Sequence, residues 1–137
     1  MATRPFGYRE IEHIADRELQ IWAPDLATLL EQAARGMYAL AGARWRSEPR
    51  QTRTIEIEAR DSESLLVAFL TELLYFGEHE SLGFDSYHIE LKGNSLRAEL
   101  SGAPLASIDK EIKAVTYHKL AIHQTDRGLE VNVVFDV

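Results

Sequence analysis

The strongest structural signal in the chain is a β-hairpin in the segment GFDSYHIELKGNSLRAELSG, residues 83–102. Gly93-Asn94 is a two-residue turn of the hairpin type, and polar and apolar residues alternate on both sides of it. We therefore expect two antiparallel strands, over residues 83–92 and 95–102. The fold that contains them must include antiparallel sheet.

Two helices are predicted before the hairpin. Asp25 is a suitable N-cap for a helix over residues 26–40, in which apolar residues recur every three to four positions, and Gly42 is a suitable residue to end it. Asp61 is the expected N-cap of a second helix, from Ser62 to about Phe76. Apolar residues cover most of its circumference, which is typical of a central buried helix.

Alternating or extended segments account for the remaining predicted strands. They lie at residues 6–13, 18–22, 52–59 and 129–137, the last after a turn at residues 126–128. Two helices among about seven strands predict an α+β fold, with the helices packed on a mostly antiparallel or mixed sheet. No linker or repeat is visible, so we expect residues 1–137 to form a single domain.

Composition narrows the possible functions. The chain has 137 residues, a formal net charge of −7 and no cysteine. The absence of cysteine excludes disulfides, thiolate nucleophiles and zinc held by cysteine. The acidic charge argues against a protein that grips DNA or RNA directly, so RNA would be reached through a partner. Because no apolar run approaches the ~20 residues of a membrane span and no signal pattern opens the chain, we expect a cytoplasmic protein without a membrane partner.

Acidic groups lie near both ends of the chain. The segment 12–16 ends in Asp16, and Asp136 precedes Val137 with its α-carboxylate. Turn aspartates usually cap main-chain N–H groups, and chain ends usually fray. If the first and last strands meet, however, these carboxylates form an all-oxygen ligand set that prefers Ca²⁺, Mg²⁺ or Mn²⁺ to zinc. His13 could orient a carboxylate or join as a ligand, although a lone histidine is more often structural.

A third candidate region is residues 112–118, with the sequence IKAVTYH. If this segment is a strand, alternation places Lys113, Val115 and Tyr117 on one face. A solvated lysine is the default interpretation of Lys113, and packing or hydrogen bonding is the default for Tyr117 and His118. Signature motifs of common catalytic sites are missing from the chain, so an enzyme is unsupported.

These regions resemble the archeases, small proteins that activate the RtcB-type tRNA-splicing RNA ligase. The resemblance covers almost the whole chain and consists of five motifs in the same order. Residues 8–16 are similar to an aromatic-led stretch ending in E-H-T-A-D, residues 33–37 to A-A-x-G-M, residues 64–75 to S-L-L-x-x-x-L-x-E-L-L-Y, residues 112–118 to K-A-V-T-Y-H, and residues 133–137 to V-x-F-D-[IV].

The resemblance implies a non-catalytic protein that binds a divalent metal, commonly calcium, with magnesium and manganese as alternatives. The implied ligands are Asp16, Asp136 and Val137, the same groups that ligand chemistry favours. Lys113 is the implied residue for activation of the ligase.

Three further residues are candidates to support the metal ligands: Glu12, His13 and His118. The chain departs from the family pattern at Ile14, where threonine is usual, so any hydrogen bond made by that hydroxyl is absent. The aspartate two residues later is retained.

The implied partner is an RtcB-type ligase, which guanylylates its own histidine with GTP and a divalent metal before it joins RNA ends. The resemblance implies that this protein promotes guanylylation and multiple turnover, in tRNA splicing or RNA repair. An alternative is a general chaperone or protein-interaction module with a purely structural metal. A third is a small metal-dependent hydrolase with His13 as base and Asp16 as ligand, for which the sequence offers neither nucleophile nor oxyanion donors.

Overall fold

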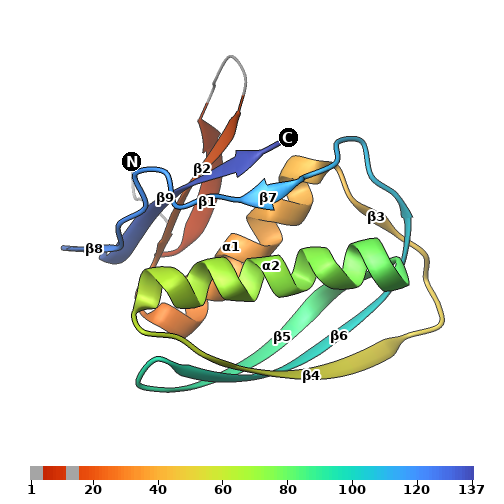
Figure 1. Ribbon diagram of the computed structural model, residues 1–137, viewed down its shortest axis with the longest axis horizontal. Helices are drawn as coiled ribbons and strands as arrows, with labels where there is room; N and C mark the ends of the chain where they lie inside the picture. Colours follow the sequence, from red (N-terminus) through yellow and green to blue (C-terminus); the bar gives the residue numbers. More distant parts are fainter. Residues whose placement is uncertain (1–4, 12–15) are drawn as a thin grey trace.

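The computed structural model describes residues 5–11 and 16–137. Within these ranges the elements follow one another as β1 (Gly7–Ile11), β2 (Arg17–Ala23), α1 (Leu26–Ala41), β3 (Arg44–Trp45), β4 (Gln51–Glu58), α2 (Ser62–Glu80), β5 (Leu82–Lys92), β6 (Ser95–Ser107), β7 (Ala114–Val115), β8 (His123–Thr125) and β9 (Gly128–Asp136) (Figure 1). The predicted α+β class is confirmed. The described residues contain nine strands instead of about seven, because β3, β7 and β8 are too short to carry a periodic signal.

The strands form two antiparallel sheets. One has the order β1-β2-β9-β7, with β8 paired to β9. In the other, β6 pairs with β3, β4 and β5. The first and last long strands of the chain, β2 and β9, are therefore neighbours at the centre of one sheet (Figure 1).

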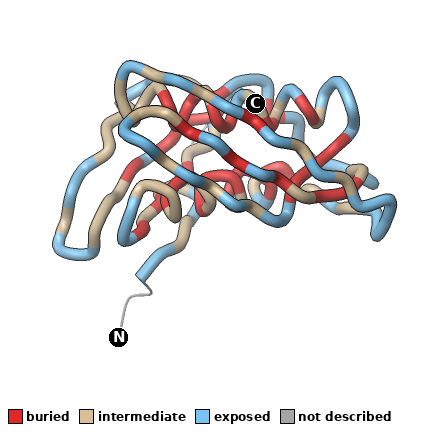
Figure 2. The backbone as a smooth tube through the Cα atoms, turned by 90° about the horizontal axis from the view of Figure 1, so that it is seen from below, coloured by how far each residue is buried: buried red, intermediate tan, exposed pale blue. Residues whose placement is uncertain are grey.

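The two helices cover one face of each sheet. α1 packs on β1, β2, β5 and β9, and α2 on β4, β5, β6 and β7. On β2, Leu19, Ile21 and Ala23 are buried against this layer, whereas the residues between them are not. Buried and exposed positions alternate along the strands in the same way in Figure 2. Burial of alternate residues fixes which side chains of the sheet face the helices.

The helix caps are those predicted. Asp25 accepts a hydrogen bond from Thr28 N at 2.8 Å, and Asp61 accepts one from Ser64 N at 2.7 Å. Gly42 ends α1 with a φ of 63°, a conformation that costs glycine little. α2 runs beyond Phe76, the predicted end, as far as Glu80. The prediction was short because apolar residues stop at Phe76, while the helix continues through polar residues that nothing interrupts.

The hairpin is confirmed, but its strands extend beyond the predicted limits. β5 begins at Leu82 and β6 continues to Ser107, so Gly83 and Gly102 lie inside strands instead of at their ends. A Cβ atom on Gly102 would lie 1.8 Å from Gly83 O. The two backbones approach each other here, next to a bulge between Phe84 and Ser86. These glycines permit that close approach, and they do not end the strands.

Candidate functional site

The pairing of β2 with β9 brings the two predicted acidic ligands to the same end of one sheet. Arg17 pairs with Phe135 in the antiparallel register. Asp16 precedes Arg17 and Asp136 follows Phe135, so each aspartate is the next residue beyond this last pair. The two aspartates therefore lie at the same end of the β2–β9 pair, and a metal site shared between them stays a prediction.

The carboxylate of Asp136 belongs to the sheet face that points away from the helices. Phe135 is fully buried against the helices, and alternation directs Asp136 to the other face, where it is exposed. Asp16 is also exposed. Opposite residues of antiparallel strands have Cβ atoms about 4.5–5.5 Å apart, and like charges at that separation destabilise a sheet. Among the described residues, no ion pair neutralises either carboxylate.

The last strand is held on both sides near its end. β7 pairs with β9 through Ala114↔Asp136 and Val115↔Phe135, and Lys113 N donates a hydrogen bond to Asp136 O at 2.8 Å. Val137 is half-buried and packs against the core. The main chain at the predicted ligands is thus fixed by its neighbours, as expected for a strand that stays apolar to its end.

Lys113 lies next to this sheet end, but the strand predicted around it is short. Only Ala114 and Val115 are paired as β7. Thr116 donates to Val134 O through both its N and its Oγ1, at 3.0 and 2.9 Å, and the chain then turns. Tyr117 is therefore 57% exposed and does not share a buried face with Val115.

The three supporting candidates have different outcomes. His118 is exposed in the turn, where its N donates to Thr116 Oγ1 at 3.3 Å. Glu12 and His13 lie outside the described residues, as does Ile14. A role for these residues beside the metal ligands stays a prediction.

The predicted ligands, Asp16, Asp136 and Val137, offer only oxygen donors. The carboxylates of Asp16, Asp136 and the Val137 terminus suit a hard divalent cation and would be relieved of their mutual repulsion by it. In the described part of the chain, no three histidine, aspartate or glutamate side chains gather in one place. The predicted site therefore depends on two side chains and a main-chain carboxylate at one end of the β2–β9 pair.

A second polar cluster surrounds the β5 bulge. Tyr38 accepts a hydrogen bond from Phe84 N at 3.2 Å, and Tyr87 donates one to Phe84 O at 2.6 Å. Burial raises the pKa of both tyrosines well above the ordinary value, so neither ionises near neutral pH. Arg50 donates two hydrogen bonds to Asp85, at 2.8 and 2.9 Å, and holds the pKa of that carboxyl below its usual value. These groups stabilise the bulge and are not poised for proton transfer.

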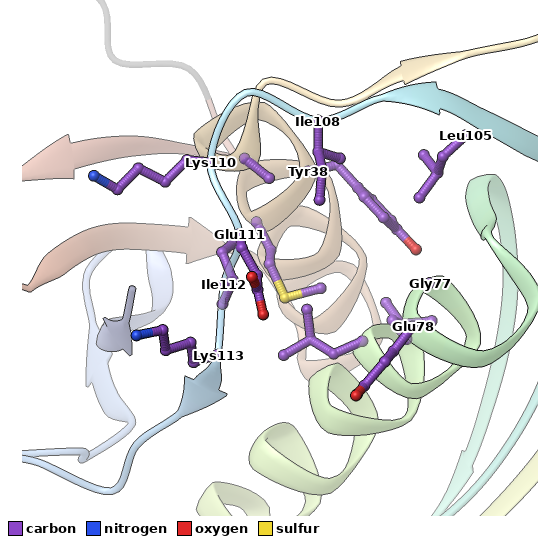
Figure 3. A pocket seen from close by; sticks show the side chains of 13 residues that line it. Tyr38, Gly77, Glu78, Leu105, Ile108, Lys110, Glu111, Ile112 and Lys113 are labelled. Atoms are coloured by element: carbon purple, nitrogen blue, oxygen red, sulfur yellow. The ribbon is translucent and has the colours of Figure 1, made fainter.

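Lys113 also lines a pocket of about 340 Å³ between α1, α2 and residues 108–113 (Figure 3). Sequence reasoning missed this pocket, because its walls come from segments with no common motif. The available signal was Gly77, an isolated glycine within a helical pattern, which often marks a packing or functional constraint.

No helix in the described part of the chain is long and apolar enough to cross a membrane.

Known proteins resemble this chain over nearly its full length. A model of the Archease protein family matches residues 8–137. Protein archease from Thermococcus gammatolerans is 30% identical over 129 residues, covering 88% of this chain and 91% of the relative. Protein archease from Methanosarcina barkeri is 32% identical over 146 residues, covering 100% of both chains.

Two solved structures share the fold. Protein 1598 of Methanobacterium thermoautotrophicum aligns with a TM-score of 0.71 at 23% identity, over 96% of this chain and 99% of that protein. A Thermotoga maritima protein described as an archease and possible chaperone aligns with a TM-score of 0.70 at 22% identity, over 100% of this chain and 99% of that protein. The arrangement of two helices and antiparallel sheets is thus found in known structures.

Proposed function

The chain belongs to the archease family, and from that premise we propose that it is a non-catalytic activator of an RtcB-type RNA ligase. In this proposal it binds a divalent metal and promotes the GTP-dependent guanylylation and multiple turnover of the ligase, in tRNA splicing or RNA repair. It works in the cytoplasm and meets RNA only through the ligase.

The observation that supports the proposal is the strand register at the end of the β2–β9 pair. Asp16 and Asp136 are the next residues beyond its last pair, Arg17↔Phe135, and Lys113 N donates a hydrogen bond to Asp136 O. Two exposed carboxylates and a cationic side chain thus come from three segments that are far apart in the sequence. Such an arrangement can hold a cation at an accessible edge of the protein, where it can meet another macromolecule.

The proposed metal ligands are Asp16, Asp136 and the Val137 carboxylate. Calcium is the first candidate, with magnesium or manganese as alternatives, because all three prefer oxygen donors. A bound divalent ion supplies positive charge that stabilises phosphate oxygens. The chain's own residues position that charge: β7 and β9 fix the main chain, and the two aspartates face solvent together.

The second candidate function is a general chaperone or protein-interaction module whose metal is only structural. It is favoured by the description of the Thermotoga maritima structure as a possible chaperone. The two functions differ in what the metal-site variants lose. A structural metal predicts joint loss of stability and partner binding, whereas an activating metal predicts a folded protein that binds the ligase and fails to stimulate it.

RNA joining by the cognate RtcB-type ligase with GTP and Mn²⁺ tests the proposal. This protein is added at sub-stoichiometric amounts as wild type, Asp16→Ala, Asp136→Ala and Lys113→Ala, with Asp126→Ala as a matched control. Asp126 is an exposed aspartate in the β8–β9 turn, at the other end of β9.

We expect wild type and Asp126→Ala to convert the ligase from single to multiple turnover, and the three site variants to fail. If wild type binds the ligase without changing its rate, the activator function is wrong and the interaction module takes its place.

A further inference from the structure

The pocket beside Lys113 has an apolar interior. Its floor is formed by Met37, Leu73, Leu74 and Ile112, from α1, α2 and the segment before β7. Ile108 lies at the rim and is 48% exposed, although it is a large aliphatic residue. The volume of about 340 Å³ is at the low end of the ~300–1,000 Å³ found for small-molecule sites, so one or two large side chains would fill it.

Two carboxylates flank this interior. Glu78 on α2 and Glu111 on the opposite segment come from opposite walls of the pocket, whereas the ammonium ends of Lys110 and Lys113 point away from it (Figure 3). Neither glutamate has an ion-pair partner among the described residues. An occupant with an apolar group between positive charges would therefore be complementary to the pocket.

The pocket and the proposed metal site are linked through one residue. Lys113 lines the pocket, and its N donates to Asp136 O at 2.8 Å. A partner that covers the acidic sheet end is thus already adjacent to the rim at residues 108–113. One macromolecule bound at this sheet end can contact both features.

We infer that this pocket anchors an apolar side chain from a Lys- or Arg-rich surface segment of the ligase. The inference rests on the proposed function and adds a second contact with the ligase. In it, the pocket provides affinity for the ligase, and the metal-bearing sheet end provides activation. Burial of an apolar residue in the pocket supplies binding energy, and Glu78 and Glu111 select for neighbouring positive charge.

Gly77 offers a way to fill the pocket with little disturbance of the core. A Cβ atom there would have only Leu105 Cδ1 and Leu82 O as near neighbours, at 3.8 and 3.9 Å. Gly77→Leu places a branched side chain in the pocket, and both leucine and alanine favour a helix more than glycine does. Gly77→Ala is the matched control, because it shares the gain in helix propensity but leaves most of the volume open.

A second pair of variants tests the charges. Glu78→Gln with Glu111→Gln removes both carboxylates, and the control is Glu58→Gln with Glu99→Gln. The control residues are exposed on β4 and β6 and do not line the pocket, and no ion pair involves them among the described residues.

Binding of each folded variant to the full-length cognate ligase is measured by biolayer interferometry with Mn²⁺, at low and high salt, and self-association by sedimentation velocity. We expect Gly77→Leu to weaken binding about tenfold or more and Gly77→Ala to bind within about twofold of wild type. The variant with both Glu78→Gln and Glu111→Gln should bind the ligase more weakly than wild type at low salt only, since salt screens charge attraction.

The inference is overturned if wild type binds the ligase and Gly77→Leu binds equally well, or if Gly77→Ala loses as much affinity. It is also overturned if Gly77→Leu only abolishes self-association, because the occupant is then a second copy of this chain. If wild type does not bind the ligase at all, the proposed function fails first, and this result differs from all the others.

Discussion

Replacing Asp16 by asparagine should change the stability of the protein in opposite directions with and without metal. Without metal, the proposed site holds two carboxylates just beyond the Arg17↔Phe135 pair, and we take their repulsion to be about 0.2–1 kcal/mol, the size of other cross-strand pair energies. The Asp16→Asn substitution removes one charge while keeping the shape of the side chain. The variant should therefore be slightly more stable than wild type in a chelator, but it should lose the stabilisation that a bound cation gives to wild type.

The two effects differ in size. A ligand at one hundred times its Kd stabilises the native state by about 2.7 kcal/mol. With an unfolding entropy of about 2.1 cal/mol/K per residue, 137 residues give a change of about 3.5 °C in Tm for each kcal/mol. Saturating metal should then raise the Tm of wild type by about 9 °C, whereas Asp16→Asn in a chelator should raise it by only about 1–3 °C.

Thermal unfolding followed by circular dichroism, in EDTA and in a calcium titration, gives both values. The control is Asp126→Asn, which removes one exposed carboxylate at the opposite end of β9 and should keep the full response to metal. The reasoning is refuted if Asp16→Asn keeps the calcium-induced rise in Tm. A lower Tm than wild type in EDTA would contradict the proposed repulsion between Asp16 and Asp136.

Three further perturbations test other parts of the structure. Gly102→Ala should destabilise the fold by several kcal/mol, measured by urea unfolding, because the added Cβ would lie 1.8 Å from Gly83 O; a loss below about 1 kcal/mol would mean that the strands can separate there. Asp85→Asn should lower stability at pH 7, because Arg50 holds the pKa of the native carboxyl below 3.8; the difference should shrink as the pH falls below that value, and a constant difference from pH 7 to pH 3 would contradict it. Extending the chain beyond Val137 by two glycines should weaken calcium binding in calorimetry as Asp136→Asn does, since a peptide bond replaces the proposed carboxylate ligand; unchanged affinity would remove that carboxylate from the ligand set.

Local signals in the sequence predicted most of the fold. The two aspartate caps, the Gly93-Asn94 turn and the alternation of β9 each involve residues within a few positions of one another. Failures occurred where a residue's role depends on a distant segment. Gly83 and Gly102 looked like strand ends because their close approach across β5 and β6 is not visible in either strand alone. The short strands β3, β7 and β8 were missed for a similar reason, because they are recognised only by their pairing with other strands.

The candidate site was likewise predictable in its residue types and not in its arrangement. Chemistry identified Asp16 and Asp136 as potential oxygen ligands, but only the pairing of β2 with β9 shows that they lie at the same end of one sheet. The pocket beside Lys113 had no sequence signature, since Glu78 and Glu111 line one pocket only after α2 and the segment before β7 pack together. Residues that act together from separate elements are found by structure, and residue type alone indicates only what they could bind.

The most direct test of a metal held between the two ends of the chain is paramagnetic broadening by Mn²⁺ in NMR spectra of the ¹⁵N-labelled protein. Sub-stoichiometric Mn²⁺ should first broaden the amide signals of Arg17, Ala114 and Asp136, while those at the Gly93-Asn94 turn stay sharp. Asp16→Asn should abolish this selectivity. Broadening that begins elsewhere, or that is the same in Asp16→Asn, would contradict a metal site at the end of the β2–β9 pair.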